Sequence, residues 1–147
     1  MIYPKIIKHG SSEYDEMINL RYKILREPLG LSFSENDLEK DKKSFLLVLF
    51  MPVRNKIIAC CILTPIDKKI IKLRQMAVDD SIQKSGMGTA MLSFAEYVAV
   101  KEGFGRIELN AREAAVGFYQ KYDYDILSDK FMEVGIPHYK MGKQLNK

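Results

Sequence analysis

The sequence predicts a single α/β domain, residues 1–147, built on a mixed sheet. The chain has 147 residues, of which 47% are hydrophobic, enough to bury a core without metal or disulfide. A continuous apolar run at residues 45–51 is typical of a strand buried on both faces, and two more strand candidates follow it at short turns. A long helical pattern then separates these strands from others near the C-terminus.

In the first half of the chain, turn and capping residues separate the expected elements. A short strand over residues 3–7 precedes Ser12-x-x-Asp15, an approximate capping box that predicts the start of a helix. Pro28 ends this helix, since proline cannot continue it. Residues 32–44 are polar and acidic, which predicts a loop or a short exposed helix with a solvated face. Three strands follow, at 45–51, 56–63 and 70–78, the first two as an antiparallel hairpin.

The second half is expected to alternate helices with shorter strands. Apolar residues at helical spacing predict a long helix that begins near Gly88 and ends near Glu102, with Gly103 as its C-terminal stop. The remaining elements are a strand, a short helix and two further strands, at 106–111, 113–121, 124–127 and 138–142.

Charge and cysteine content argue against several classes of protein. The formal net charge is +4, but the five bases in the first and last ten residues account for it, so no continuous basic stripe for nucleic acid is expected. The longest apolar run is far shorter than the roughly 20 residues that span a bilayer. Cys60 and Cys61 are neighbours that point to opposite faces of a strand, so we expect small buried residues in a reduced, cytoplasmic protein. With His9 and His138 far apart, no metal site is predicted.

The most informative segment is Gln83-Lys84-Ser85-Gly86-Met87-Gly88-Thr89, between a strand and a long helix. A helix N-terminus leaves backbone N–H groups unpaired and favours anions. Glycines there allow the backbone to approach a pyrophosphate, and Thr89 adds a hydroxyl. The sequence has neither the lysine-containing loop of nucleoside triphosphatases nor a dinucleotide-binding G-x-G-x-x-G after the first strand. The loop therefore predicts a phosphorylated cofactor, with a tight turn as the alternative.

The chain resembles the GNAT acyltransferases (Gcn5-related N-acetyltransferases), particularly small bacterial members. Residues 83–88 match their [QR]-x-x-G-x-[GA] loop, five residues after Val78. Residues 114–124 resemble the A-x-x-F-Y-x-x-x-G-F segment, with Asp123 and Tyr124 in place of its glycine and phenylalanine. Residues 135–141 resemble a known C-terminal ending. The resemblance implies a mostly antiparallel sheet of about six to seven strands, with a splayed parallel pair (70–78 and 106–111) and helices on both faces.

The resemblance also implies acetyl-CoA as co-substrate, without a metal, bound between the splayed strands. Strand residues would pair with the pantetheine arm and the loop would cradle the pyrophosphate. The implied cofactor-binding residues are Met76, Ala77, Val78, Gln83, Lys84, Ser85, Gly86, Met87, Gly88, Thr89, Asn110, Phe118 and Tyr119. Arg21, Arg26 and the acidic residues 35–41 would lie near the acceptor.

The implied reaction is acetyl transfer to an amine, which needs an acid and a base. In the family pattern Tyr119 is the acid that protonates the leaving thiolate. Gln75 stands where some members carry a carboxylate, which leaves Glu108 and His138 as candidate bases. We favour His138 because histidine titrates near neutral pH, with a structural hydrogen bond as the alternative.

Two further functions stay open at this point. One is a non-catalytic acyl-CoA sensor with the same fold, and the other is a nucleic-acid-binding module. The expected partners are a small-molecule or peptide amine, with no nucleic acid and no membrane, and a homodimer is an open alternative.

Overall fold

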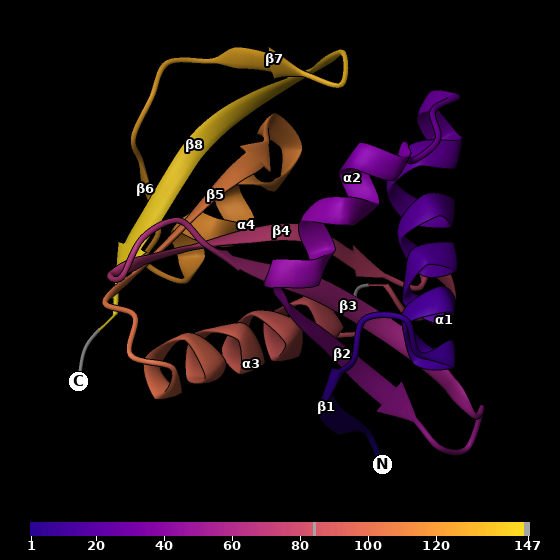
Figure 1. The fold of residues 1–147 in the computed structure, drawn as a ribbon. Helices are drawn as coiled ribbons and strands as arrows, with labels where there is room; N and C mark the ends of the chain where they lie inside the picture. The colour runs from indigo at the N-terminus through magenta and orange to yellow at the C-terminus, as the bar shows by residue number, and fades with distance from the viewer. Residues whose placement is uncertain (84, 146–147) are drawn as a thin grey trace.

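The computed structural model describes residues 1–83 and 85–145, and in these residues the sheet has eight strands. Their order is β1-β2-β3-β4-β5-β8-β6, with β7 paired to β8. The strands are β1 Tyr3–Ile7, β2 Phe45–Met51, β3 Lys56–Pro65, β4 Ile70–Val78, β5 Arg106–Arg112, β6 Asp125–Ile126, β7 Phe131–Glu133 and β8 Ile136–Gln144. The α-helices are α1 Ser12–Arg21, α2 Glu35–Glu39, α3 Met87–Lys101 and α4 Val116–Lys121 (Figure 1). Only β4 and β5 pair in parallel, which confirms the predicted fold class.

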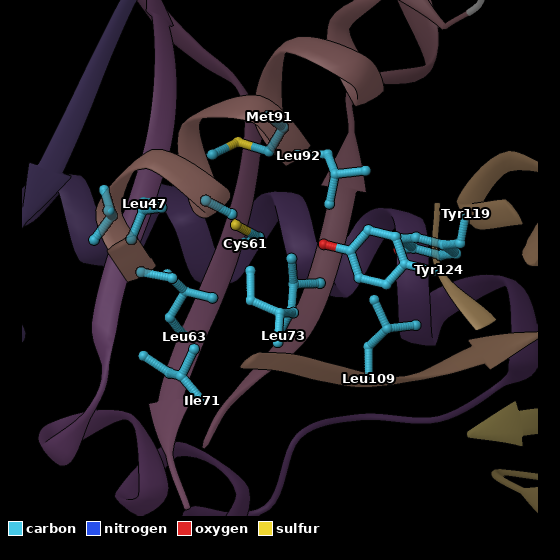
Figure 2. Close-up of a cluster of buried hydrophobic side chains, with 14 of the residues drawn as sticks. Leu47, Cys61, Leu63, Ile71, Leu73, Met91, Leu92, Leu109, Tyr119 and Tyr124 are labelled. Carbon is cyan, nitrogen blue, oxygen red and sulfur yellow. The ribbon is translucent and has the colours of Figure 1, made fainter. Parts of the chain in front are cut away.

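Helices pack on both faces of this sheet, and each face has its own buried cluster. Alternate residues of β3 divide between them, because neighbours on a strand point in opposite directions. Cys61 packs with Met91 of α3 and its neighbours (Figure 2), whereas Cys60 packs with Met17 of α1. Both cysteines are free and fully buried, as the sequence predicted for small core residues.

The parallel pair β4–β5 separates soon after it begins. Pairing extends only over Ile70 to Lys72 on β4. Further along β4, Gln75 has a φ of 58°, and the register with β3 shifts between Cys60 and Ile62. This bulge bends β4 and places both Leu73 and Met76 against the α3 cluster, although they are three residues apart. The splay expected from the family resemblance is therefore present.

The α1 helix begins and ends differently from the sequence prediction. Its N-cap is Ser11, whose hydroxyl accepts from the Tyr14 amide at 3.1 Å, so the expected cap at Ser12 is wrong by one residue. Beyond Arg21 the chain continues as a π-helical turn, η1 (Tyr22–Arg26), and a 3-10 turn, η2 (Glu27–Leu29). This irregular end places Arg26 beside the splayed strands.

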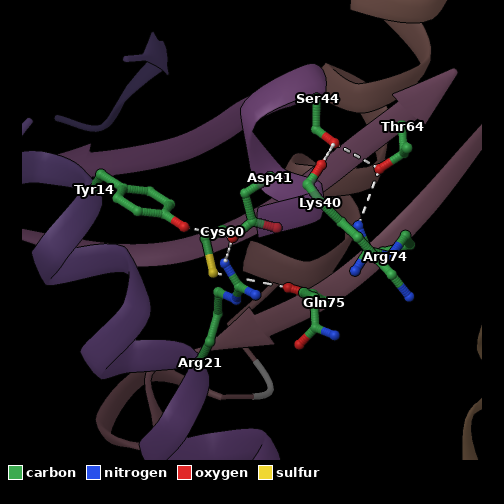
Figure 3. Close-up of polar contacts among 9 residues, drawn as sticks. All are labelled: Tyr14, Arg21, Lys40, Asp41, Ser44, Cys60, Thr64, Arg74 and Gln75. Carbon is green, nitrogen blue, oxygen red and sulfur yellow. Dashed lines mark hydrogen bonds and ion pairs between the residues drawn. The ribbon is translucent and has the colours of Figure 1, made fainter. Parts of the chain in front are cut away.

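A buried ion pair connects α1 to η3 (Lys40–Lys43), the short turn after α2. Arg21 Nη1 donates to Asp41 Oδ2 at 2.8 Å, and Tyr14 donates to the same oxygen at 2.7 Å (Figure 3). Both charged side chains are fully buried. The prediction of a solvated acidic face over residues 35–41 is therefore wrong at Asp41, and Arg21, which was expected near the acceptor, forms a buried structural ion pair.

The C-terminal strands also differ from the prediction. The strand expected at 124–127 is only two residues long, and the three-residue β7 was missed altogether. β7 turns into β8 through Val134 and Gly135, whose φ values of 46° and 75° match the two left-handed positions of a tight hairpin turn. A β-branched residue rarely adopts this conformation, so the sequence carries no ordinary turn signal here.

Candidate active site

A cavity of about 790 Å³ lies where β4 and β5 separate. It brings together eleven of the predicted site residues: Met76, Ala77, Val78, Gln83, Gly86, Gly88, Thr89, Asn110, Phe118, Tyr119 and His138. Ser85 and Met87 belong to the same loop and helix but do not line the cavity. Lys84 lies outside the described residues.

The N-terminus of α3 opens onto this cavity through its glycines. Gly86 caps the helix with a φ of 87°, a left-handed conformation that glycine adopts readily, and it has no side chain of its own to bond to the first turn. A Cβ on Gly88 would lie 3.6 Å from the Phe118 ring. The exposed N–H groups and the helix dipole favour an anion at this position.

Asp79 fixes the chain just before this loop. It accepts from the Ser81 amide at 2.9 Å, which starts η4 (Asp80–Ile82), and from Lys56 Nζ at 2.8 Å. Burial acts to raise the pKa of this carboxyl, but the bonds from Lys56 and Ser81 outweigh it and hold the pKa well below its usual range. Asp79 was given no role from the sequence, because its ion-pair partner Lys56 lies on β3 and no local pattern indicates that contact.

Tyr119 lies between the cavity and the core. Its ring contacts Phe118 edge-on, with centroids 5.1 Å apart. It also contacts Tyr124 edge-on, with centroids 5.6 Å apart, and both tyrosines are labelled in Figure 2. Burial, reinforced by Cys61, raises the pKa of its phenol well above the usual range, so it stays protonated at neutral pH. Within residues 1–83 and 85–145, no protein group hydrogen-bonds to this hydroxyl. Thr89, in contrast, has a partner already: its hydroxyl lies 2.8 Å from that of Tyr122.

His138 lies on the opposite side of the sheet, beside a carboxylate that sequence analysis missed. Its Nδ1 is 2.8 Å from the Ile136 carbonyl, so Nδ1 carries the proton in the neutral ring. Nε2 lies 3.7 Å from Glu133 Oε2, and Glu133 Oε1 accepts from Asn110 at 3.0 Å. His138 therefore makes the structural hydrogen bond that was the alternative to a role as base. Its Nε2 makes no hydrogen bond within the described residues. Glu133 belongs to the strand that the sequence did not reveal.

The other candidate bases have competing contacts or lack the needed group. Glu108 pairs with Arg106 at 3.0 Å and with Lys140 at 3.4 Å, and it does not line the cavity. Gln75 lines the cavity, but an amide cannot act as a base. Among the residues expected near the acceptor, Arg26 alone lines the cavity. Two arginines that the sequence did not single out, Arg74 and Arg112, line it as well.

No group of three or more His, Cys, Asp or Glu side chains among the described residues could hold a metal ion. No helix among them has the length and hydropathy to cross a membrane.

Comparison with known proteins identifies the family to which the chain belongs. The acetyltransferase (GNAT) domain matches residues 32–145, so the chain belongs to this family. A relative, the uncharacterized protein YyaT of Bacillus subtilis (strain 168), is 36% identical over 76 residues, which are 52% of this chain and 51% of YyaT. The aligned stretch thus spans about half the length of that relative.

Solved structures extend the similarity over nearly the whole chain. An acyl-CoA N-acyltransferase from Pseudomonas aeruginosa superposes with a TM-score of 0.83 at 15% identity, covering 97% of this chain and 98% of its own. A GNAT family acetyltransferase from Elizabethkingia anophelis, with acetyl-CoA bound, superposes with a TM-score of 0.74 at 20% identity, covering 98% of each chain. At these identities the similarity concerns the fold.

Proposed function

We propose that this protein transfers an acetyl group from acetyl-CoA to the amino group of an acceptor. The cavity at the split between β4 and β5 carries this proposal, because it joins a bare helix N-terminus to a phenol on one side and an imidazole on the other. Membership in the GNAT family and the acetyl-CoA bound to the Elizabethkingia anophelis protein support the same cofactor. Acetyl-CoA would supply the activated thioester.

In this proposal the α3 side of the cavity holds the cofactor. The N–H groups that follow Gly86 would receive the pyrophosphate, and the strand edge near Met76 and Val78 would pair with the pantetheine arm. Gln83 Nε2 donates to the Val78 carbonyl at 2.9 Å, so this side chain would have to release that oxygen before the arm can use it. Phe118 would form the opposite wall.

Tyr119 would stabilise the thiolate that leaves when the amide bond forms. Because its pKa is raised, complete proton transfer to the leaving thiolate, whose conjugate thiol has a pKa of about 8.5, is uphill. Hydrogen-bond donation from the neutral phenol to the sulfur needs no such transfer and lowers the barrier in the same direction. Its hydroxyl has no partner among the described residues and is free to serve this purpose.

His138 would accept the proton that the amine loses. An alkylammonium has a pKa of about 10.4, so deprotonation at neutral pH costs about 4–5 kcal/mol unless a base assists. The Nε2 lone pair of the neutral ring is available, and Glu133 lies where it would stabilise the imidazolium that results. Asn110 would hold Glu133 in place.

Single substitutions test these assignments one at a time. Gly88→Val should weaken CoA binding in calorimetry at least tenfold, because the branched side chain would crowd Phe118 and the cavity. Gly105→Val is the matched control, since a Cβ at Gly105 meets open space away from the cavity. Unchanged CoA affinity in Gly88→Val would contradict the assignment.

Tyr119→Phe then separates an enzyme from an acyl-CoA sensor. The sensor stays the second candidate because His138 is the single residue proposed as the base. We expect kcat to fall at least tenfold, because removing one hydrogen-bond donor to a developing anion costs about 10²–10³-fold, with CoA affinity unchanged. Full activity in this variant would refute the role of Tyr119. A wild-type protein that binds CoA but acetylates no amine would favour the sensor.

The compartment is a further part of the proposal. Two buried free thiols fit a reducing compartment, and we propose the cytoplasm.

A further inference from the structure

The arginines around the cavity identify a class of acceptor, on the condition that the proposed function holds. We infer that the acceptor amine carries a carboxylate or phosphate group, and that Arg26, Arg74 and Arg112 bind this anion beside His138. The three arginines come from η1, β4 and β5, so distant parts of the sequence converge on one cavity.

All three arginines belong to the side of the sheet away from α3. On β5, Leu109 and Ala111 pack into the α3 cluster, so Arg112 points to the opposite face. On β4, Leu73 packs into the same cluster, so Arg74 also points away from it. Arg26 follows α1, which covers that opposite face. The pyrophosphate cradle at Gly86 and Gly88 begins α3, so the arginines are separate from it.

These guanidinium groups lack the anionic partners that half-buried cations normally have. Within residues 1–83 and 85–145, no carboxylate lies within 4 Å of any of the three. The only carboxylate among the described lining residues is Glu133, which already contacts Asn110 and His138. Burial lowers the pKa values of Arg26 and Arg74, while Asp37 and Glu133 act in the opposite direction without outweighing it.

Few of their donors are used by the protein. Arg74 Nη1 donates to Thr64 Oγ1 at 3.1 Å (Figure 3), and Arg112 Nη2 donates to the Leu25 carbonyl at 3.3 Å. Arg26 makes one long contact, 3.5 Å from its Nη1 to the same carbonyl. Its guanidinium also stacks on Phe33, 4.7 Å from the ring centroid, which restrains its orientation. Since each guanidinium has five N–H donors, most remain for a ligand.

Unused, oriented guanidinium donors favour planar carboxylates and phosphates, which they bind through paired hydrogen bonds. A carboxylate or phosphate on the acceptor would neutralise part of the charge of the three arginines, and the paired hydrogen bonds would orient the acceptor. His138 and Glu133 share this side of the cavity, so the amino group of such an acceptor would lie near the proposed base. A polycationic amine would meet three cations and one carboxylate, which opposes its binding, and an amine without an anionic group would leave the three cations without a counter-charge.

The test uses conjugates in which CoA is joined through a methylene-carbonyl linker to an amine, so that binding needs no turnover. Calorimetry compares alanine with alaninamide conjugates, and phosphoethanolamine with ethanolamine conjugates; the two pairs distinguish a carboxylate from a phosphate. We expect the anionic member of one pair to bind at least about tenfold more tightly, as hydrogen bonds to charged groups imply. Arg74→Gln and Arg112→Gln should each reduce this preference, while the affinity for CoA itself stays unchanged.

Arg54→Gln is the matched control, because Arg54 is exposed and does not line the cavity. Equal affinity within both pairs, or a preference that survives both substitutions in folded protein, would overturn the inference. So would an equal loss of affinity for plain CoA in Arg74→Gln and Arg112→Gln, because these residues would then serve the cofactor. Failure of the wild-type protein to bind plain CoA would instead overturn the proposed function on which the inference rests.

Discussion

The buried ion pair between Arg21 and Asp41 should be the most sensitive polar contact in the fold. Asp41→Ala removes the acceptor for Arg21 at 2.8 Å and for Tyr14 at 2.7 Å, and leaves a fully buried guanidinium without its counter-charge. Breaking such a pair costs about 3–5 kcal/mol. For a chain of this length, each kcal/mol lowers the Tm by about 2–4 °C, so we expect a decrease of about 6–20 °C.

Urea unfolding and calorimetry measure this loss, with Asp80→Ala as the matched control. Asp80 pairs with Lys23 at 3.7 Å and both side chains are more than half exposed, so its removal should cost about 1 kcal/mol or less. A loss in Asp41→Ala no larger than in this control would refute the reasoning.

Replacing both charges should be far less harmful than removing one. Among the described residues, Arg21 Nε and Nη2 and Asp41 Oδ1 are buried without partners, so the pair does not recover its whole desolvation cost. Arg21→Met with Asp41→Leu should therefore be more stable than Asp41→Ala alone. Additive losses in the double variant would contradict this interpretation.

Three further outcomes are expected elsewhere in the fold. Asp79→Asn should destabilise by about 1.5–3 kcal/mol at pH 7; because the folded pKa of Asp79 is depressed, this difference should shrink as the pH falls below about 4. A difference that grows in acid would contradict the assignment. Val134→Asn should raise stability by about 1 kcal/mol in thermal unfolding, since asparagine tolerates a φ of 46° better than valine does; a lower Tm would argue against strain in this turn. Burial raises the pKa of Cys60 to about 12 and that of Cys61 well above its usual range, so a thiol reagent should label neither until the protein unfolds. Rapid labelling of the native protein would show that the thiols are accessible.

The features that sequence analysis predicted correctly depend on short-range patterns. The bounds of β2 follow from a continuous apolar run that ends at a turn, and the start of α3 follows from glycines that lie within the same few residues. The match of this loop to a known family then connected it to a cofactor. Contacts between distant segments carry no such local pattern. Arg21 and Asp41 are 20 residues apart and each resembles an ordinary surface charge.

The missed part of the site has a physical explanation as well. β7 is three residues long, too short to show alternation, and its turn places a valine where asparagine or glycine would signal a hairpin. Glu133 therefore looked like one acid among many. Arg74 and Arg112 were overlooked because the side of a strand that a charge occupies depends on the bulge at Gln75 and on which helix packs against which face.

The bulge at Gln75 also bears on how substitutions in β4 would affect the two sides of the cavity. Beyond it, Met76 belongs to the α3 side of β4, while Arg74, two positions earlier, belongs to the other side. One strand thus presents an apolar side chain on the side proposed for the cofactor and a cation on the side proposed for the acceptor. If the proposed assignments hold, substitution at Arg74 would alter the choice of acceptor without disturbing the cofactor side, so the two specificities could diverge independently within a single strand.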